Sequence, residues 1–488
     1  MARIEAGTCA SALWVAALCG GVVFRAEPAR AEVPASPETP VGWRGDGSGR
    51  FPEATPVTEW SGTKNVVWRT PMPAWSHSEP VVMGQYVLVT AEPTTLLCIR
   101  RTDGRIVWQK THNLEDTLPS GKRAQVKKDL VAAARIRKVK LDPLKRRFRE
   151  ITRRLQTSPE DRFLRSQKGS MRRSIQSLEK KLAGLEEYRP PRVDSAMGYS
   201  KCTPVTDGQG VFALFGNGVG AVYDLSGDRK WMRVIRRAKM PFGFSMSPVL
   251  AGRALVMGID KELVAVDAGT GGELWRRPTA RPSGGLAAAK IGEVRVVVTA
   301  EGSVVRASDG KFLDRTRRPA RVALSAPVIR NGVLYLLGAG QQLTIDLLVS
   351  DSPGDVRLKN LAAGRAFQGV YYTSPLYHDG CVFFWDRKNV LSVVDARTGR
   401  LMRSKRIGLS GMAYSSPTLG GKHLFLGTDD GTMAVILPSV VREGDSALRV
   451  DLKDVARNKL EPMRSSPVFA GKHMYVRTLK SLYCIGGE

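Results

Sequence analysis

The chain has few cysteines and few acidic residues for its length. Six cysteines occur among 488 residues, and none is adjacent to another or part of a C-x-x-C pair, which excludes a vicinal disulfide and a C-x-x-C-H haem site. No apolar run after residue 24 is long enough to cross a bilayer. Asp and Glu number 46 against 75 Lys and Arg, for a net charge of +29. This excess of positive charge indicates either anionic partners or a solubilising surface.

The first 31 residues have the pattern of an export signal. Arg3 precedes the apolar run Leu13–Phe24, and a polar stretch then ends in Ala29-Arg30-Ala31. An A-x-A sequence after a short apolar run is typical of a cleaved signal peptide, so we expect cleavage after Ala31. A lipoprotein anchor at Cys19 is less favoured, because the residue before it is not small. The mature protein is expected to be soluble, in the periplasm or secreted.

Four cysteines remain after such a cleavage, and they lie far apart in the sequence: Cys98, Cys202, Cys381 and Cys484. Export leads to an oxidising compartment, where disulfides persist. The wide and irregular spacing nevertheless favours buried free thiols over disulfides.

A short motif, S-x-P followed by a turn and an alternating apolar run, recurs along the chain. Two copies near the C-terminus, 415–428 and 465–478, share nearly the same pattern. Further copies begin at His77, Lys201, Ser245, Leu324 and Tyr372, and a degenerate copy begins at Gly285, which makes eight units. Self-similarity at a spacing of roughly 40–50 residues is typical of repeat architectures.

Each unit has the sequence pattern of four antiparallel strands. Turns such as Asn331-Gly332 and Asp379-Gly380 separate alternating apolar runs, which is a strong hairpin signal. In several units a fourth run follows a T-G or D-G turn and ends in tryptophan, as in Val264–Trp275. The pattern predicts an all-β fold, an eight-bladed β-propeller with four-stranded antiparallel blades. An orphan strand around Trp68 is expected to complete the last blade and close the ring.

A segment with a different periodicity, 111–194, interrupts the repeats. Apolar residues recur at helical spacing within it, and Asp142-Pro143 and Ser158-Pro159 resemble helix starts. We predict a basic α-helical hairpin between blades 1 and 2, with a preceding helix from about Lys122 to Lys140. Residues 111–192 carry 23 Lys and Arg against 10 Asp and Glu. This basic face could dock a partner or an anionic lipid or polysaccharide surface, or simply be solvated.

The predicted organisation comprises five segments. They are a signal peptide (1–31), a leading segment (32–56), the ring-closing strand with blade 1 (57–110), the helical insertion (111–194) and blades 2 to 8 (195–488). Nucleic-acid binding is not expected, because few aromatic residues accompany the basic ones in the insertion. We expect a monomer.

The loops that lead into the innermost strands of a propeller converge at one mouth of its channel. In each unit this place is three residues before the proline of the motif. The candidate ligand-binding residues are His77, Lys201, Ser245, Tyr372, Tyr414 and Arg464, and Gly285 and Leu324 hold the same position in the other two units. Cationic and tyrosine side chains together favour a carboxylate, a phosphate, a sugar or an acidic protein segment, although they could also merely fill the funnel.

His77 is the best single candidate for acid–base chemistry, because histidine titrates near neutral pH and Trp75 and Glu79 are close in sequence. No set of nucleophile, base and orienting residue can be assembled from the sequence. Asp429-Asp430-Gly431 resembles part of a calcium loop but is expected to be a hairpin turn.

The repeats S-S-P-V…G…V-Y-V and D-A-x-T-G-x-x-x-W resemble those of the pyrroloquinoline-quinone-like (quinoprotein-type) β-propellers. The chain looks most like their non-catalytic, BamB-like members and exported planctomycete propellers, which similarly open with W-R-G, here Trp43-Arg44-Gly45. The catalytic members bind the quinone with calcium, and the acidic and amide ligands that this requires do not cluster here. The resemblance implies an exported, non-catalytic binding scaffold for envelope proteins, without metal or quinone. The alternatives are a quinone-dependent dehydrogenase with a degenerate site and a propeller that binds sugar or an anionic polymer.

Overall fold

The computed structural model of the chain describes residues 35–36, 39–189, 197–237, 245–279, 284–316, 324–337, 342–365, 372–443 and 447–487. Their strands form seven four-stranded sheets and one five-stranded sheet. Neighbouring strands are antiparallel throughout, except for one short parallel strand, β1, at the edge of the five-stranded sheet. The predicted signal peptide lies outside the described residues.

In each of the first four sheets, the four strands follow one another in the chain. The first holds β3 (Val81–Met83), β4 (Tyr86–Ala91), β5 (Thr95–Arg100) and β6 (Ile106–Thr111); the second holds β7 (Val205–Thr206), β8 (Gly210–Leu214), β9 (Val219–Asp224) and β10 (Arg229–Val234). The third holds β11 (Val249–Ala251), β12 (Ala254–Ile259), β13 (Glu262–Asp267) and β14 (Glu273–Pro278); the fourth holds β15 (Leu286–Ile291), β16 (Val294–Thr299), β17 (Ser303–Arg306) and β18 (Phe312–Arg315).

The remaining four sheets continue the same order. They hold β19 (Val328–Arg330), β20 (Val333–Leu337), β21 (Gln342–Val349) and β22 (Arg357–Arg365); then β23 (Leu376–His378), β24 (Cys381–Trp385), β25 (Val390–Asp395) and β26 (Leu401–Arg406). Next come β27 (Thr418–Gly420), β28 (His423–Gly427), β29 (Thr432–Glu443) and β30 (Ala447–Lys459), joined by β1 (Arg50–Phe51). The last sheet holds β31 (Val468–Ala470), β32 (His473–Arg477), β33 (Ser481–Ile485) and β2 (Val66–Pro71).

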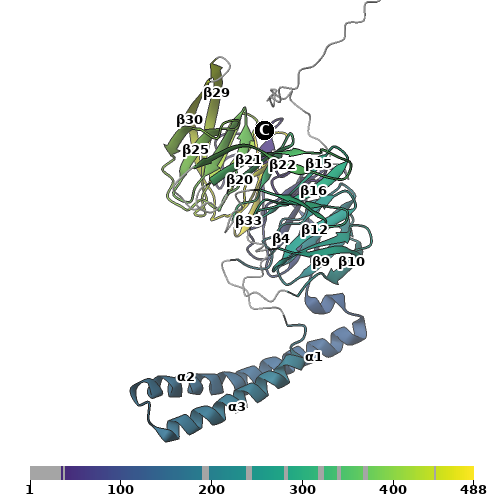
Figure 1. Cartoon of the computed structure of the whole chain (residues 1–488), viewed down its shortest axis with the longest axis vertical. Helices are drawn as coiled ribbons and strands as arrows, with labels where there is room; N and C mark the ends of the chain where they lie inside the picture. Colours follow the sequence, from purple (N-terminus) through teal and green to yellow (C-terminus); the bar gives the residue numbers. More distant parts are fainter. Residues whose placement is uncertain are drawn as a thin grey trace, which may run out of the picture.

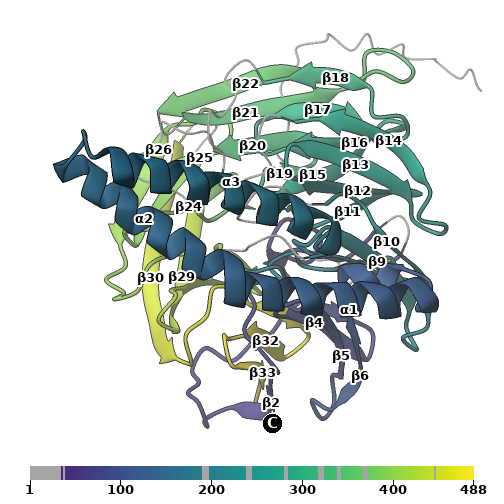
Figure 2. The same cartoon turned by 90° about the horizontal axis from the view of Figure 1, so that it is seen from below.

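The last sheet is completed from the other end of the chain. Strand β2 pairs antiparallel with β33, and Trp68 lies opposite Cys484. The orphan strand around Trp68 therefore occupies the outer position that the sequence predicted for it. Figure 2 shows β2 beside β33. In seven of the sheets the first strand begins directly after a motif proline, whereas β15 of the fourth sheet begins at Leu286 in the degenerate copy, which has no proline.

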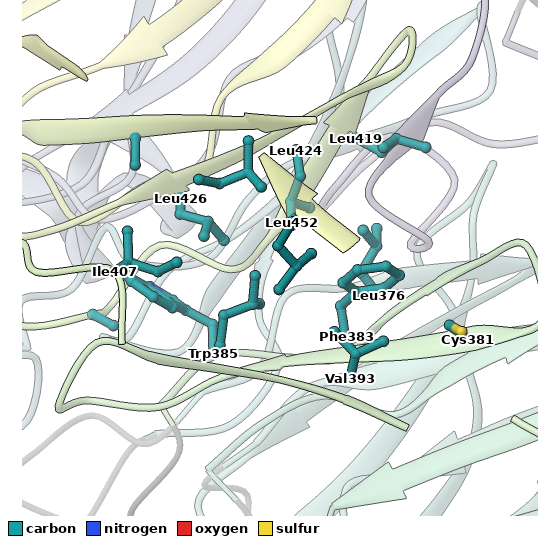
Figure 3. Close-up of a cluster of buried hydrophobic side chains, with 14 residues drawn as sticks. Leu376, Cys381, Phe383, Trp385, Val393, Ile407, Leu419, Leu424, Leu426 and Leu452 are labelled. Atoms are coloured by element: carbon teal, nitrogen blue, oxygen red, sulfur yellow. The ribbon is translucent and has the colours of Figure 1, made fainter. Parts of the chain in front are cut away.

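Buried apolar side chains fill the junctions between neighbouring sheets. In the described part of the chain, eight clusters each combine residues of two consecutive sheets, and one of them joins the last sheet to the first. Figure 3 shows one junction, in which Phe383 and Trp385 of β24 approach Leu424 and Leu426 of β28. Each fully buried side chain of this kind contributes about 1.5–3 kcal/mol. The sheets are thus linked into a closed circle.

A tryptophan at the outer strand of a sheet also ties it to the next sheet. The indole N–H of Trp108 donates to Leu225 O, and that of Trp231 donates to Ala268 O. Trp68 and Trp275 make the corresponding bonds to Arg101 O and Ala307 O. Each ring lies on the glycine of the neighbouring turn, where a Cβ atom would come within 2.6–2.9 Å of it: Gly104, Gly227, Gly271 and Gly310. This contact explains why a T-G or D-G turn accompanies the tryptophan in the repeat.

The inserted segment is helical. Helix α1 (Ser120–Ile136), a short π-helical turn η2 (Arg137–Leu141) and α2 (Asp142–Thr157) follow one another without a break, and α3 (Arg162–Leu185) runs back beside α2 (Figure 1). The expected helix start at Asp142-Pro143 is therefore wrong. Pro143 lacks an N–H and its ring needs room near a carbonyl of the preceding turn, and the wider turn η2 immediately before it provides that room.

The start of α3 also differs from the prediction. Its N-cap is Asp161, whose side chain accepts a hydrogen bond from Leu164 N at 2.9 Å, whereas Ser158 ends α2. The base of the hairpin is anchored on the second sheet, because Val126 of α1 and Tyr188 pack with Val219 of β9. Preceding these helices is a single turn, η1 (Leu114–Thr117). Among the described residues, no helix is both long and apolar enough to cross a membrane.

Candidate functional site in the central channel

The eight positions three residues before the motif prolines surround one cavity. Its volume is about 730 Å³, and its walls come from the inner strands of several sheets together with the leading segment around Trp43. The lining includes all six candidate residues and both of the remaining positions: His77, Lys201, Ser245, Gly285, Leu324, Tyr372, Tyr414 and Arg464. We call the wall formed by these eight residues the funnel.

Four of the funnel side chains, together with Trp75, form one continuous series of contacts. The rings of Tyr372 and Tyr414 are nearly parallel, at 5° and 5.0 Å between centroids. The Arg464 guanidinium lies 4.6 Å from the centre of the Tyr414 ring, a cation–π contact, and its Nη1 is 3.4 Å from His77 Nε2. The His77 ring in turn lies 5.0 Å from that of Trp75.

The funnel is electrically positive. Burial lowers the pKa of His77 to about 3, and the nearby charges of Arg464, Lys201 and Arg477 contribute to this shift. The imidazole is therefore neutral at physiological pH, and its Nε2 can accept the hydrogen bond from Arg464. Burial also lowers the pKa of Lys201. A histidine held neutral by burial and by positive neighbours is poorly suited to act as a general base near neutral pH.

Ser245 belongs to the funnel wall but its hydroxyl is engaged with a neighbouring sheet. Cys202 Sγ lies 3.1 Å from Ser245 Oγ, and both residues are buried. All four cysteines predicted to remain after cleavage are buried and free. The prediction of free thiols is confirmed.

A relay of hydrogen bonds runs around the channel just below the funnel. In five sheets, the residue directly before the motif proline donates its backbone N–H to the side-chain oxygen of the equivalent residue in the next sheet. The bonds are Glu79 to Thr203 (3.0 Å), Thr203 to Ser247 (3.0 Å), Ala326 to Ser374 (2.8 Å), Ser374 to Ser416 (3.0 Å) and Ser416 to Ser466 (2.9 Å). Ser466 closes the circle by hydrogen bonding to the Glu79 carboxylate. The relay is interrupted at Ala287 and Ala326, which have no hydroxyl.

The leading segment enters the channel from the side opposite the funnel. Val41 bridges Thr206 of β7, and Arg50–Phe51 (β1) pair with β27 on the far side of the channel. Between them, Arg44 is 1% exposed and its guanidinium reaches the carbonyl oxygens of two motif prolines: Nη1 donates to Pro375 at 2.8 Å and Nη2 to Pro417 at 2.5 Å. We call residues 39–51 the plug.

Glu79 connects the plug with the relay. Its carboxylate Oε2 accepts the backbone N–H of Arg44 at 2.8 Å and also bonds with Ser466. Burial raises the pKa of Glu79, although the hydrogen bonds and the Arg44 charge oppose this effect. The carboxylate is therefore committed to the plug and to the closure of the relay, and not to His77.

The sequence indicated Arg44 only as part of an opening W-R-G motif and Glu79 only as a neighbour of His77, and it predicted the channel role of neither residue. A signal was present in the four glycines that surround Arg44, namely Gly42, Gly45, Gly47 and Gly49. At Gly49 a Cβ atom would lie 2.3 Å from Arg44 Nη2, so the close approach requires glycine. Such a cluster indicates a tightly folded segment, but not where it inserts.

Comparison with known proteins gives a consistent fold. A family model described as outer membrane protein assembly factor BamB matches residues 53–147 and 259–347. Among solved structures, quinohemoprotein alcohol dehydrogenase from Comamonas testosteroni is 10% identical with a TM-score of 0.51, covering 90% of this chain and 79% of its own. Quinohemoprotein alcohol dehydrogenase ADHIIG from Pseudomonas putida HK5 is 11% identical with a TM-score of 0.50, covering 89% and 74%.

BamB from Moraxella catarrhalis is 12% identical with a TM-score of 0.43, over 58% of this chain and 80% of its own. No curated protein sequence matches the chain. Repeated four-stranded antiparallel sheets around a central channel define a β-propeller. Within that class, the family match supports a PQQ-like β-propeller repeat protein, and the two dehydrogenase structures share its fold.

Proposed function

We propose that this protein is a non-catalytic binding scaffold whose eight sheets are the blades of one closed propeller. Its funnel takes a carboxylate-bearing segment of a protein partner. The observation that carries this proposal is the cation–π contact of Arg464 with the stacked tyrosines, on the wall of a cavity of about 730 Å³ that Lys201 also lines. Positive groups with partly desolvated surroundings attract carboxylates strongly, and the tyrosine faces offer apolar contact to the chain that carries them.

The closed architecture supports a scaffold. Junctions filled by apolar clusters and the relay of hydrogen bonds hold the inner strands in fixed relative positions. The plug is held at the other end of the inner strands by Arg44 and Glu79, and we propose that a ligand enters from the funnel side. The matching family model is described as an assembly factor for outer membrane proteins, which supports a protein partner in the cell envelope. Because residues 1–31 have the pattern of a cleaved signal peptide, we also propose that the protein is exported.

The residues around the channel do not fit a quinone held with calcium. Calcium takes six to eight oxygen ligands, typically carboxylates and carbonyls. The described residues contain no group of three or more His, Cys, Asp and Glu side chains that could hold a metal ion. Of the two acidic residues that line the cavity, Glu79 is committed to Arg44 and Ser466, and Asp46 accepts bonds from Ser48. We therefore propose no quinone and no metal cofactor.

A short glutamate-rich peptide tests the funnel. Binding is followed by the fluorescence of the full chain, since Trp75 lies against His77 in the series of contacts at the funnel. Changing Lys201 and Arg464 together to Gln is expected to weaken binding about tenfold or more, as expected for the loss of charge-assisted bonds. The matched control removes two exposed charges elsewhere, Lys422→Gln and Arg397→Gln. Equal binding by both variants would overturn the proposal.

The partner itself is sought by crosslinking in envelope extracts. A photo-reactive residue at Tyr372 is expected to trap a defined protein, whereas the same group at the exposed Ser439 is not. Competition by a uronic acid polymer but not by the acidic peptide would favour the polysaccharide alternative. Adding pyrroloquinoline quinone with calcium distinguishes the scaffold from the dehydrogenase alternative. A redox-active visible spectrum or a raised melting temperature would contradict a cofactor-free scaffold.

A further inference from the structure

The helical hairpin carries a large positive charge that the rest of the described chain does not neutralise. Residues 142–185, which comprise α2, α3 and the turn between them, contain 13 Lys and Arg against 5 Asp and Glu. The acidic residues account for only two ion pairs within this stretch, Lys145 with Glu179 and Arg165 with Glu160. Two parallel arrays of like charge repel each other, so an anionic surface against them would be favourable.

The basic residues are arranged as pairs along each helix. On α2 the pairs are Arg146-Arg147 and Arg153-Arg154, and on α3 a pair is formed by Arg172-Arg173; all six side chains are exposed and make no ion pair among the described residues. A spacing of seven residues corresponds to about two helical turns, so the pairs of α2 share one side of that helix. The result is an array of exposed positive charge along both helices.

The tip of the hairpin adds an apolar group to this strip. Phe163, in the first turn of α3, is 69% exposed, and Arg162 and Arg165 flank it in sequence. An acidic protein surface would neutralise the positive charges but would leave the Phe163 ring exposed to water. A lipid surface accommodates both the charges and the exposed ring. The cations contact headgroup phosphates, and the aromatic ring enters the boundary between the headgroups and the acyl chains.

We propose that the α2–α3 hairpin docks on an anionic lipid bilayer, with its paired arginines on headgroup phosphates and Phe163 at the interface. This inference goes beyond the binding scaffold and does not depend on the funnel. The hairpin leaves the propeller after β6 and the chain returns to Lys201, a funnel residue, so the hairpin and the funnel lie at the same end of the sheets. Figure 1 shows α2 and α3 beneath that end, and Figure 2 shows them crossing in front of the sheets. Docking would therefore turn the funnel towards the bilayer.

Sedimentation with vesicles tests this proposal with the full chain. The protein is expected to bind vesicles of phosphatidylcholine mixed with phosphatidylglycerol at low salt, but not pure phosphatidylcholine, and to be released at high salt. A variant with Arg146, Arg147, Arg153 and Arg154 all changed to Gln should bind about 30-fold more weakly or worse, since each basic residue near an anionic surface contributes substantially. The control carries the same four changes at Arg397, Arg400, Arg403 and Arg406, which are exposed on the propeller, and should bind normally.

A second variant, Phe163→Ser, keeps every charge and is expected to bind the mixed vesicles several-fold more weakly. Unchanged binding by the arginine variant, or an equal loss in variant and control, would overturn the proposal. So would tight, arginine-dependent binding of soluble polyglutamate without any binding of vesicles, which would indicate an acidic protein instead. The funnel variant Lys201→Gln with Arg464→Gln should bind vesicles normally, so a failure of the funnel and a failure of the hairpin can be told apart.

Discussion

The guanidinium of Arg44 donates from Nη2 to the carbonyl oxygen of Pro417 at 2.5 Å, although 373 positions separate the two residues in sequence. Its other terminal nitrogen, Nη1, donates to Pro375 in the neighbouring sheet. A single buried side chain from the start of the chain thus holds the inner strands of two late sheets. Its surroundings lead to the first prediction.

Replacing Gly49 by Ala should destabilise the protein more than replacing Gly47 by Ala. Both glycines have positive φ, 73° and 87°, so the backbone strain of the substitution is similar. At Gly49, however, the added Cβ would lie 2.3 Å from Arg44 Nη2, whereas at Gly47 it meets nothing within 4 Å. We expect an extra loss of about 1–3 kcal/mol in the free energy of unfolding, the usual cost of overpacking. Denaturant titration measures it, and equal losses would argue against a tightly held plug.

Removal of one hydroxyl group from the relay should lower the free energy of unfolding, because it leaves a buried N–H without an acceptor. In Ser416→Ala the buried N–H of Ser374 loses its acceptor, while the N–H of residue 416 keeps Ser466. A buried donor without a partner costs about 1–3 kcal/mol. Ser439→Ala, at an exposed strand position, serves as the control and should change the free energy of unfolding by less than about 0.5 kcal/mol. If the two variants unfold alike, the relay does not stabilise the ring.

The free energy of unfolding should fall as the pH is lowered from 7 to 5, a range in which His77 stays neutral in the folded protein. The pKa of His77 is about 3 in the folded protein against 6.5 ordinarily, so only the unfolded chain gains a proton between these values. At pH 5 this differential protonation removes about 2 kcal/mol of stability. His77→Gln should therefore lose less stability than the wild type between pH 7 and pH 5. Parallel pH profiles for the two proteins would contradict the assignment.

The charge of Arg464 should be detectable in the titration of its neighbour. Arg464→Gln removes one of the positive charges that lower the pKa of His77, so this pKa should rise. With five histidines in the chain, the imidazole proton resonances can be assigned by single His→Gln variants. Arg397→Gln, an exposed substitution outside the funnel, should leave the titration of His77 unchanged. A fixed pKa in both variants would mean that Arg464 does not approach His77 in solution.

The four buried thiols should be inert in the native protein. Burial raises the pKa of Cys98 and of Cys484 to about 12, and it also raises that of Cys202. Because the thiolate is the reactive form, alkylation at neutral pH should be slow until the protein is unfolded. Peptide mapping after iodoacetamide treatment, with and without urea, measures this directly. Fast labelling of Cys98 or Cys484 under native conditions would show that their sheets open.

Features that recur from repeat to repeat could be predicted from the sequence. The strands, the turns and the tryptophan that ends an outer strand recur with one pattern, so eight imperfect copies reinforce each other. The same register brought six candidate residues, from His77 to Arg464, to equivalent positions, and in the structure they surround one cavity. That these residues bind a ligand stays a prediction.

Features that occur only once were harder to predict. The insertion of Arg44 depends on carbonyl groups more than 300 residues away, and a local pattern carries no information about such a contact. The role of Glu79 depends on Arg44 in turn. The continuity of α1 and α2 was missed for another reason, because a proline after an aspartate normally marks a helix start, and here a π-helical turn accommodates it.

The pairing of β2 with β33 has a consequence for the order in which the protein can acquire its structure. Residue 66 of the nascent chain lies opposite residue 485, so the circle stays open until nearly the whole chain has been synthesised. Such distant contacts slow folding, since loop-closure entropy is lost before the contact forms. Until then, the apolar faces of the first and last sheets are exposed to other molecules. The risk of aggregation is therefore greatest before the C-terminal strands are available to pair with β2.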